Sequence, residues 1–319
     1  MPNKKEEVPL YKAVLLDASK ALSGFSGRIL EVLEVNRPPD LDYAIHLAKV
    51  VSKLSPIIGN MIEYGVVSYL NEKAPHPKGK WLRQDPGFPD TIFRGNVTPT
   101  PGIEIKTWFP LATEITARFK DSITHFTDEQ TNVAMLAWVP EFVIFGRPLI
   151  LDVWIDTASS VATARDQHYH NPPDYLVFEP EDTSSRTRNL QQTNTNGYKF
   201  QGTRDQFMKA ASIVEGWGSD GKKYSHNTRY QAKLKTLLGK FPYRLDTNFA
   251  KMDRIEHTSL EEFKNRVLSS NIAGRTVTEW TRVLRDIDTV RNTRILAELI
   301  EAPGAKQAPP IFDGERGEK

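Results

Sequence analysis

Two carboxylates and a lysine are spaced so that they could together hold a divalent cation and cut a phosphodiester bond. The segment from residue 89 to 106 reads PDTIFRGNVTPTPGIEIK, in which an aspartate follows a proline and Glu-Ile-Lys lies in an apolar run. Side chains alternate between the two faces of an extended strand, so Glu104 and Lys106 should point to the same face. Ile103 and Ile105 should point to the opposite face.

The stretch between the proline-aspartate pair and this strand predicts a hairpin. Residues 93–102 are rich in Pro, Gly and Thr, which suits a chain reversal that returns Asp90 beside Glu104 and Lys106. Carboxylate oxygens suit Mg²⁺, which keeps several water molecules for attack on phosphorus. A nearby ammonium can orient that water or offset developing negative charge. The cluster therefore favours metal-dependent phosphodiester chemistry.

Neither half of this pattern is informative alone, because acid-x-Lys and Pro-Asp each occur three times in the chain. Asp220 begins an acid-x-Lys triplet in a Gly/Ser/Asp turn, and Glu262 begins another in SLEEFKNRVL, which has helical periodicity. Only the Pro-Asp pair at Asp90 is followed at short range by a strand that carries Glu-x-Lys. The combination occurs once, and it carries the prediction.

On Pro89-Asp90 and Glu104-Ile105-Lys106, the chain resembles the PD-(D/E)xK nuclease superfamily, and within it the type II restriction endonucleases. The resemblance covers roughly residues 55 to 110. It implies a mixed β-sheet flanked by helices, Asp90 and Glu104 as Mg²⁺ ligands, and Lys106 as the residue that helps to generate or place the attacking water. It also implies cleavage that leaves a 5′-phosphate and a 3′-hydroxyl.

A helix before this segment adds a third acid. Ser55-Pro56 is typical of an N-cap and first helical residue, and the helical pattern continues to about Lys73. Glu63 faces largely apolar positions three and four residues away, where a carboxylate must be paired, metal-bound or costly. Many enzymes of the resembled superfamily carry a glutamate on this helix, so Glu63 is the expected auxiliary catalytic residue. The alternative is a glutamate at the helix boundary that reaches solvent.

Composition excludes several other kinds of site. The chain has no cysteine, which rules out disulfides, cysteine-ligated zinc, iron–sulfur clusters and a cysteine nucleophile. Its 39% hydrophobic and 26% charged residues are ordinary for a globular protein. The charged N-terminus has no signal-peptide core behind it, and no apolar run approaches membrane-spanning length. We therefore expect a cytoplasmic protein that has no membrane partner.

The order of apolar and periodic segments predicts an α/β fold with a mixed central sheet and helical additions at both ends. Strands are expected at NVAMLAWV, FVIF, LILDVWID and YLVFE, with SSVATARDQHY as a helix between the last two. The predicted organisation is one endonuclease domain over residues 1–301, followed by a flexible tail at 302–319. The domain is expected to consist of a helical part at about 6–54, a catalytic core at about 55–180, and a DNA-recognition and helical part at about 181–301.

A basic segment is the expected DNA-binding surface. Between residues 186 and 240, eleven basic residues accompany only three acidic ones, and local positive density drives binding to phosphates. Arg reads guanine and Asn or Gln reads adenine through paired hydrogen bonds, whereas Lys suits phosphate. A solvated loop of the same composition is the alternative. The predicted contacts are Arg186, Arg188, Asn189, Gln191, Gln192, Asn194, Asn196, Lys199, Arg204, Lys222 and Lys223.

The sequence thus predicts a Mg²⁺-dependent, sequence-specific endonuclease that acts on double-stranded DNA as a homodimer. A repair or recombination nuclease that recognises DNA shape is one alternative, because the same metal site serves both. Another is a non-catalytic DNA-binding protein, in which Glu104 and Lys106 form an ion pair on an exposed sheet face and Asp90 caps a turn. The last predicted helix, TEWTRVLRDIDTVRNTRILAELIE, has an apolar stripe that suits either core packing or a dimer interface.

Overall fold

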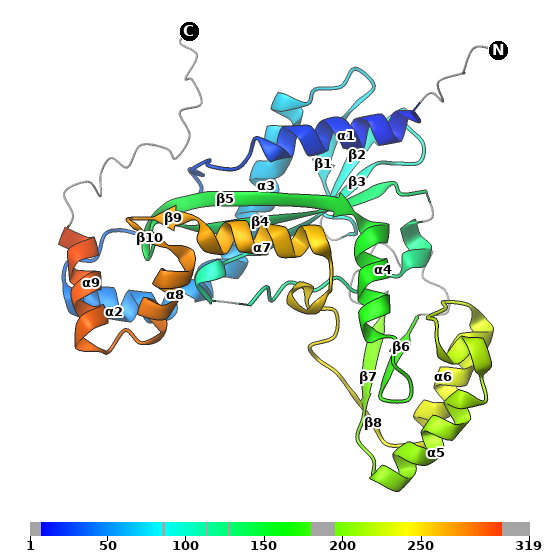
Figure 1. Ribbon diagram of the computed structural model, residues 1–319. Helices are drawn as coiled ribbons and strands as arrows, with labels where there is room; N and C mark the ends of the chain where they lie inside the picture. The colour runs from blue at the N-terminus through cyan, green and yellow to red at the C-terminus, as the bar shows by residue number, and fades with distance from the viewer. Residues whose placement is uncertain (1–7, 85–86, 113, 127, 180–194, 302–319) are drawn as a thin grey trace.

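The centre of the protein is a five-stranded mixed β-sheet with helices on both sides (Figure 1). The computed structural model describes residues 8–84, 87–112, 114–126, 128–179 and 195–301. The strands lie in sequence order and comprise β1 (Gly79–Arg83), β2 (Thr91–Gly95), β3 (Gly102–Trp108), β4 (Thr131–Phe142) and β5 (Phe145–Thr157). The pair β3–β4 is parallel and the other neighbours are antiparallel. The predicted α/β class with a mixed sheet flanked by helices is confirmed.

The parallel pair requires a crossover between β3 and β4, because parallel strands cannot be joined by a tight turn. This crossover spans residues 109–130, and its described part contains two short 3₁₀ turns, Pro110–Ala112 and Ile123–Phe126. It runs across one face of the sheet and buries Ile115, Phe119 and Phe126 there. The crossover is therefore an irregular segment that is anchored by its apolar side chains.

Alternation along β4 divides the core into two layers, because successive side chains face opposite sides of the sheet. Ala134, Leu136 and Trp138 pack toward α1 (Leu10–Ser23) and α3 (Ser55–Lys73), whereas Val133, Met135 and Ala137 pack toward α4 (Ala158–Tyr169) and α7 (Thr258–Ser269). A sheet that is covered on both faces explains why almost all of β4 is buried.

The N- and C-terminal helices pack together beyond one end of this sheet. Here α2 (Leu41–Val50) contacts α9 (Val290–Glu301), and α8 (Val277–Arg285) follows the short ladder of β9 (Asn271–Ile272) and β10 (Arg275–Thr276) (Figure 1). The prediction of one long final helix was wrong, because the helix ends at Arg285 and restarts at Val290. Most of its apolar stripe is core, although Val290 is 90% exposed.

The first helix, α1, ends at Ser23, where Gly24 caps it. One further boundary differs from the sequence prediction. The FVIF segment is not a separate strand, because Val143 has φ 66° and lies with Ile144 in the turn between β4 and β5. A β-branched residue rarely adopts this left-handed conformation, so the pattern could not reveal the turn.

A separate lobe, made of residues 175–179 and 195–245, extends below the sheet (Figure 1). It contains a three-stranded antiparallel sheet of β6 (Tyr175–Phe178), β7 (Asn196–Phe200) and β8 (Tyr243–Leu245), covered by α5 (Arg204–Glu215) and α6 (Thr228–Lys240). Its own apolar cluster includes Leu176, Val214, Leu234 and Leu237. Within the described residues, no helix has the length and apolar character needed to cross a membrane.

Candidate active site

The β2–β3 hairpin brings Asp90 next to Glu104, as the turn-rich sequence between them predicted. The pairing places Thr91 opposite Ile103, so Asp90 lies at the start of β2 beside the middle of β3. The backbone N–H of Asp90 donates to Oε2 of Glu104 at 3.2 Å, and the N–H of Ile105 donates to Oδ2 of Asp90 at 2.7 Å. These reciprocal bonds fix the two carboxylates relative to each other.

Lys106 completes this cluster from the same face of β3. Its Nζ donates to Oε1 of Glu104 and forms an ion pair with it. The Glu104 side chain is 1% exposed and the Lys106 side chain 20%, so the pair lies inside the protein. The Glu104–Lys106 ion pair of the alternative interpretation is therefore present, but it does not lie on an exposed sheet face. Ile103 and Ile105 pack into the opposite layer, as alternation predicted.

Close packing of α3 on β3 supports this arrangement from the other side of the sheet. A Cβ added at Gly59 would come within 2.9 Å of the Thr107 hydroxyl oxygen, so a larger residue would push the helix away from the strand. The helix begins at Ser55, with Leu54 rather than Ser55 at the N-cap position and no side-chain cap. The predicted extent of this helix, to Lys73, is confirmed.

Glu63 lies on α3 at the edge of the cluster and is neither fully buried nor unpaired. Its Oε2 accepts a hydrogen bond from Nη2 of Arg83, at the end of β1, at 3.2 Å. Burial and the negative charge of Asp90 raise the pKa of Glu63, while Arg83 and Lys106 oppose that rise. Glu63 is thus electrostatically part of the cluster but is held by an arginine that sequence analysis did not identify.

Burial and the neighbouring charges shift the pKa values of Glu104 and Lys106. Burial raises the pKa of Glu104 to about 8, and the nearby charges of Asp90 and Asp121 add to the effect, although Lys106 opposes it. Burial also disfavours the Lys106 ammonium, but the carboxylates of Glu104, Asp90 and Asp121 outweigh it and raise the pKa of Lys106. Lys106 therefore stays charged, and a further cation close to Glu104 would favour the ionised form of that carboxyl.

Asp121, in the crossover between β3 and β4, is a member of the cluster that sequence analysis missed. Its side chain is buried, the residue being 4% exposed, and its Oδ1 has no hydrogen-bond partner within the described part of the chain. Burial raises its pKa to about 6, Lys106 and Arg165 oppose that rise, and Asp90 adds to it. No spacing rule connects this aspartate to the hairpin, so no sequence signal could have found it.

The carboxylates of this cluster suit a metal ion that takes only one or two ligands from the protein. Among the residues that the structure describes, no group of three or more His, Cys, Asp or Glu side chains could hold a metal ion by itself. Asp90 and Glu104 form a pair of carboxylates, and Mg²⁺ commonly binds one or two protein carboxylates and fills its other positions with water and substrate phosphate. A site that needs four protein ligands, such as structural zinc, does not fit.

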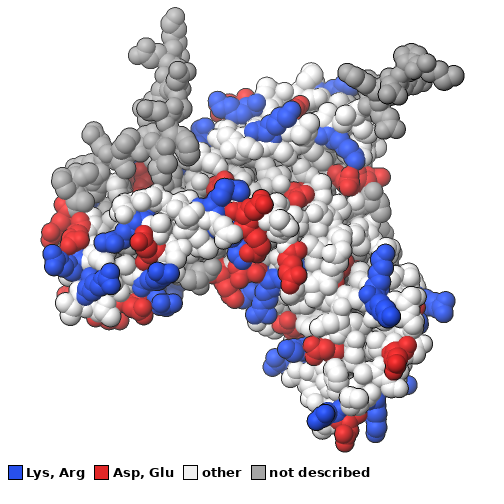
Figure 2. Space-filling model, viewed as in Figure 1, with Lys and Arg blue, Asp and Glu red and all other residues white. Residues whose placement is uncertain are grey.

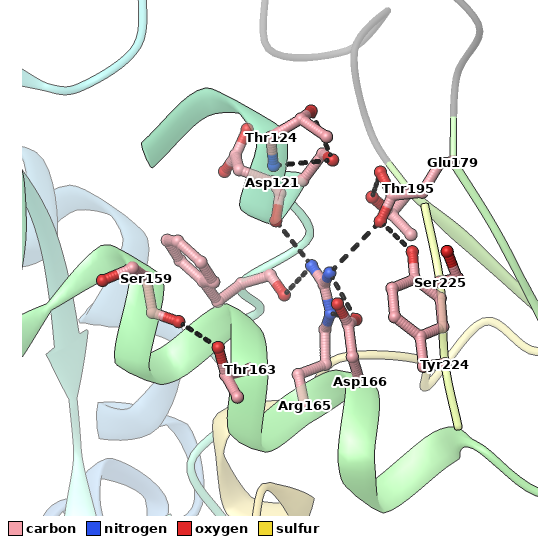
Figure 3. A network of polar contacts seen from close by, with 12 residues as sticks. Asp121, Thr124, Ser159, Thr163, Arg165, Asp166, Glu179, Thr195, Tyr224 and Ser225 are labelled. Carbon is pink, nitrogen blue, oxygen red and sulfur yellow. Dashed lines mark hydrogen bonds and ion pairs between the residues drawn. The ribbon is translucent and has the colours of Figure 1, made fainter. Parts of the chain in front are cut away.

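A second buried cluster surrounds Arg165 on α4 and joins the crossover to the lobe (Figure 3). The guanidinium donates to Oδ1 of Asp166 at 2.6 and 2.9 Å and to the backbone carbonyl of Asp121 at 2.7 Å. It also lies 3.8 Å from Oε1 of Glu179, which in turn accepts a hydrogen bond from the hydroxyl of Tyr224. Arg165 thus ties the backbone of Asp121 to Glu179, which follows β6.

The predicted DNA-contacting residues are divided between described and undescribed parts of the chain. Of those within the structure, Asn196 and Lys199 lie on β7, Arg204 begins α5, and Lys222 and Lys223 follow a 3₁₀ turn near α5. All four basic residues are exposed, and Lys and Arg side chains are visible over the lobe in Figure 2. Outside the described residues lie Arg186, Arg188, Asn189, Gln191, Gln192 and Asn194.

Comparisons with known proteins give this chain no relatives. No protein-family model matches it, and neither a curated protein nor a solved structure shows significant similarity to it. The geometry of the cluster must therefore carry any functional interpretation.

Proposed function

We propose that this protein is a Mg²⁺-dependent endonuclease that cuts double-stranded DNA at specific sequences, as type II restriction enzymes of the PD-(D/E)xK superfamily do. One observation carries the proposal: Asp90 and Glu104 are hydrogen-bonded together across a hairpin, and Lys106 contacts Glu104 from the same strand. A mixed sheet flanked by helices, the fold that the resemblance implies, is also present.

Each residue of the cluster has a role in this proposal. Asp90 and Glu104 would bind Mg²⁺, and the bound ion would supply an activated water and offset negative charge on the phosphate. Glu104 would have to give up its ion pair with Lys106 to do so. The Lys106 ammonium is then available to orient the attacking water or to stabilise the developing charge. Glu63, held by Arg83, is an auxiliary residue that shapes the charge around Asp90.

The lobe is the proposed DNA-binding surface. Its described residues include Lys199, Arg204, Lys222 and Lys223, and none of these four forms an ion pair within the described parts of the chain. Lys233, by contrast, is paired with Asp220 at 2.6 Å. Exposed cations that lack an acidic partner can bind phosphates without first breaking an internal ion pair. Cutting both strands of a symmetric site with one cluster per chain would require a homodimer.

Digestion of several plasmids with the purified protein in Mg²⁺, followed by sequencing of the ends, tests this proposal. We expect discrete fragments with 5′-phosphate and 3′-hydroxyl ends at one recurring sequence, and no cutting in EDTA. Cutting confined to branched or mismatched DNA would favour a repair nuclease. Salt-sensitive DNA binding without any cutting would favour the non-catalytic alternative, for which the Glu104–Lys106 ion pair is the supporting observation.

A further inference from the structure

The second helix of the lobe, α6, carries positive charge and no negative charge. Its thirteen residues include Arg229, Lys233, Lys235 and Lys240 and no Asp or Glu. Helix α5, which covers the same small sheet (Figure 1), has two basic and two acidic residues and is therefore neutral. Local positive density favours binding to phosphates, so α6 differs from its neighbour in the property that DNA binding requires.

The buried face of α6 fixes the orientation of the helix. Tyr230, Leu234 and Leu237 belong to the apolar cluster of the lobe. The side-chain oxygen of Gln231 accepts a hydrogen bond from the N–H of Glu179 at 3.0 Å. Packing and this hydrogen bond therefore hold one side of α6 against the lobe and leave the opposite side facing solvent.

The exposed face of α6 has small residues at its centre and basic residues along both edges. At about 100° per residue, the direction opposite to the buried side chains is that of Ala232 and Gly239. Arg229 and Lys240 border this direction on one side, and Lys235 borders it on the other. All five of these residues are exposed. The face therefore presents positive charge on both sides of a strip that has little side-chain bulk.

The fourth basic residue of α6, Lys233, points away from the exposed face. Its Nζ pairs with Oδ2 of Asp220 at 2.6 Å and lies 5.7 Å from the centre of the Trp217 ring. Lys233 lowers the pKa of Asp220, and the charge of Arg229 adds to that effect. The acid next to the helix is thus already neutralised by Lys233, and the basic residues on the two edges stay at the surface.

Neither backbone conformation nor packing requires a glycine at position 239. Gly239 is not among the described residues that have a positive φ, and a Cβ added to it would meet nothing within 4 Å. Glycine also lowers helix stability relative to alanine. A missing side chain on an exposed helix face does, however, let another molecule approach the backbone closely.

We propose that the exposed face of α6 lies in the major groove of duplex DNA, with Ala232 and Gly239 toward the base edges and the three basic residues on the phosphates of both strands. The major groove of B-DNA is about 12 Å wide and admits an α-helix. Basic residues along both edges of the face match the phosphates along both sides of the groove. The inference rests on the proposed nuclease function and gives the lobe the element by which it holds DNA.

The salt dependence of binding tests the two edges of the face. Arg229→Gln/Lys240→Gln should lower the slope of log affinity against log salt concentration by about 2, because each phosphate contact contributes about 0.9. Fluorescence anisotropy with a DNA duplex in Ca²⁺ measures this slope. Arg291→Gln/Arg294→Gln is the matched control, because it removes the same charge from α9, far from the lobe (Figure 1). An unchanged slope in the α6 variant, or an equal change in the control, overturns the inference.

An added side chain tests the centre of the face. Gly239→Gln should weaken duplex binding by about tenfold or more, because the new side chain holds the helix away from the groove. The melting temperature should not fall, since the added atoms meet open space and glutamine is the better helix former. Ser212→Gln, on the exposed surface of α5, is the matched control and should bind DNA as the wild type does. Binding by Gly239→Gln at the wild-type affinity contradicts the docking of α6.

An RNA duplex of the same length separates groove docking from charge attraction. It carries the same charge, but its major groove is too deep and narrow for side chains to read, so it should compete poorly with DNA. Equal competition would overturn the inference. A wild type that binds DNA but never cuts it would refute the nuclease function, and the same variants would still decide the role of α6. A wild type that does not bind duplex DNA would refute both.

Discussion

Two buried charged clusters lie on the same side of the sheet, and they are satisfied in different ways. Around Arg165, Asp166 accepts two short hydrogen bonds from the guanidinium, and Glu179 accepts from the hydroxyls of Thr195 and Tyr224. In the cluster of Asp90, Glu104, Asp121 and Lys106, three carboxylates act on one ammonium. Each cluster also contains one buried carboxylate oxygen that has no hydrogen-bond partner among the described residues, Oδ2 of Asp166 and Oδ1 of Asp121.

This contrast separates a structural ion network from a candidate site. Buried charges perturb the pKa in both clusters, since burial raises the pKa of Asp166 to about 6 as it does that of Asp121. A perturbed pKa alone therefore does not identify function. The feature that differs is the number of carboxylates per cation, which is two around the Arg165 guanidinium and three around the Lys106 ammonium.

The largest expected effect is the loss of cleavage when Asp90 or Lys106 is changed. Asp90→Ala or Lys106→Ala should lower the cleavage rate on the order of 10³-fold or more, because each removes a group that acts on the transition state. Specific DNA binding in Ca²⁺ should be largely retained, as measured by gel shift. The matched controls are Asp220→Ala and Lys264→Ala, which alter the other acid-x-Lys triplets. Undiminished cleavage by either cluster variant would refute the assignment.

A substitution in the Arg165 cluster should lower the stability of the fold. Arg165→Met removes the only described guanidinium beside Asp166 and Glu179 and should lower the free energy of unfolding by about 3–5 kcal/mol, because two buried acids lose their cation. Arg294→Met, which breaks an exposed ion pair with Glu298, should cost no more than about 0.5 kcal/mol. Urea denaturation measures both values. Equal effects would mean that the network is not structural.

The pH dependence of stability provides a smaller test. The folded-state pKa is raised from 4.5 to about 8 for Glu104 and from 3.8 to about 6 for Asp121. The folded protein therefore holds protons that the unfolded chain releases, so stability should fall as the pH rises from about 4 to 8. Calorimetry across this range should show a falling melting temperature, with a shallower fall between pH 4 and 6 in Asp121→Asn. A melting temperature that rises over this interval would contradict the assignment of raised pKa values.

The smallest expected effect concerns Glu63. Glu63→Gln keeps a hydrogen-bond acceptor for Arg83 and removes one negative charge near Asp90, so we expect cleavage to fall by about tenfold. Steady-state kinetics with a single-site substrate measures this change. Loss as complete as that of Asp90→Ala would make Glu63 an essential residue instead of an auxiliary one.

The sequence predicted the local part of this site well and the long-range part poorly. Strand alternation and a turn-rich segment were sufficient to place Asp90, Glu104 and Lys106 together, since all three belong to one hairpin. Asp121 and Arg83 reach the cluster through the crossover and through β1, and no periodicity in one sequence reports such contacts. Within the lobe, β6 was predicted as a strand, whereas β7 and β8 fell in what was predicted only as a basic segment, because these short strands gave no clear alternating pattern.

We propose that the cluster of Asp90, Glu104 and Lys106 binds a divalent cation and that the Arg165 cluster does not. Thermal unfolding at pH 8 with and without Ca²⁺, which should bind without supporting cleavage, tests this claim most directly in the wild type, Glu104→Gln and Asp166→Asn. A bound cation stabilises the folded state by mass action, so Ca²⁺ should raise the melting temperature of the wild type and of Asp166→Asn but not that of Glu104→Gln. No shift in the wild type, or the same shift in Glu104→Gln, would contradict the account.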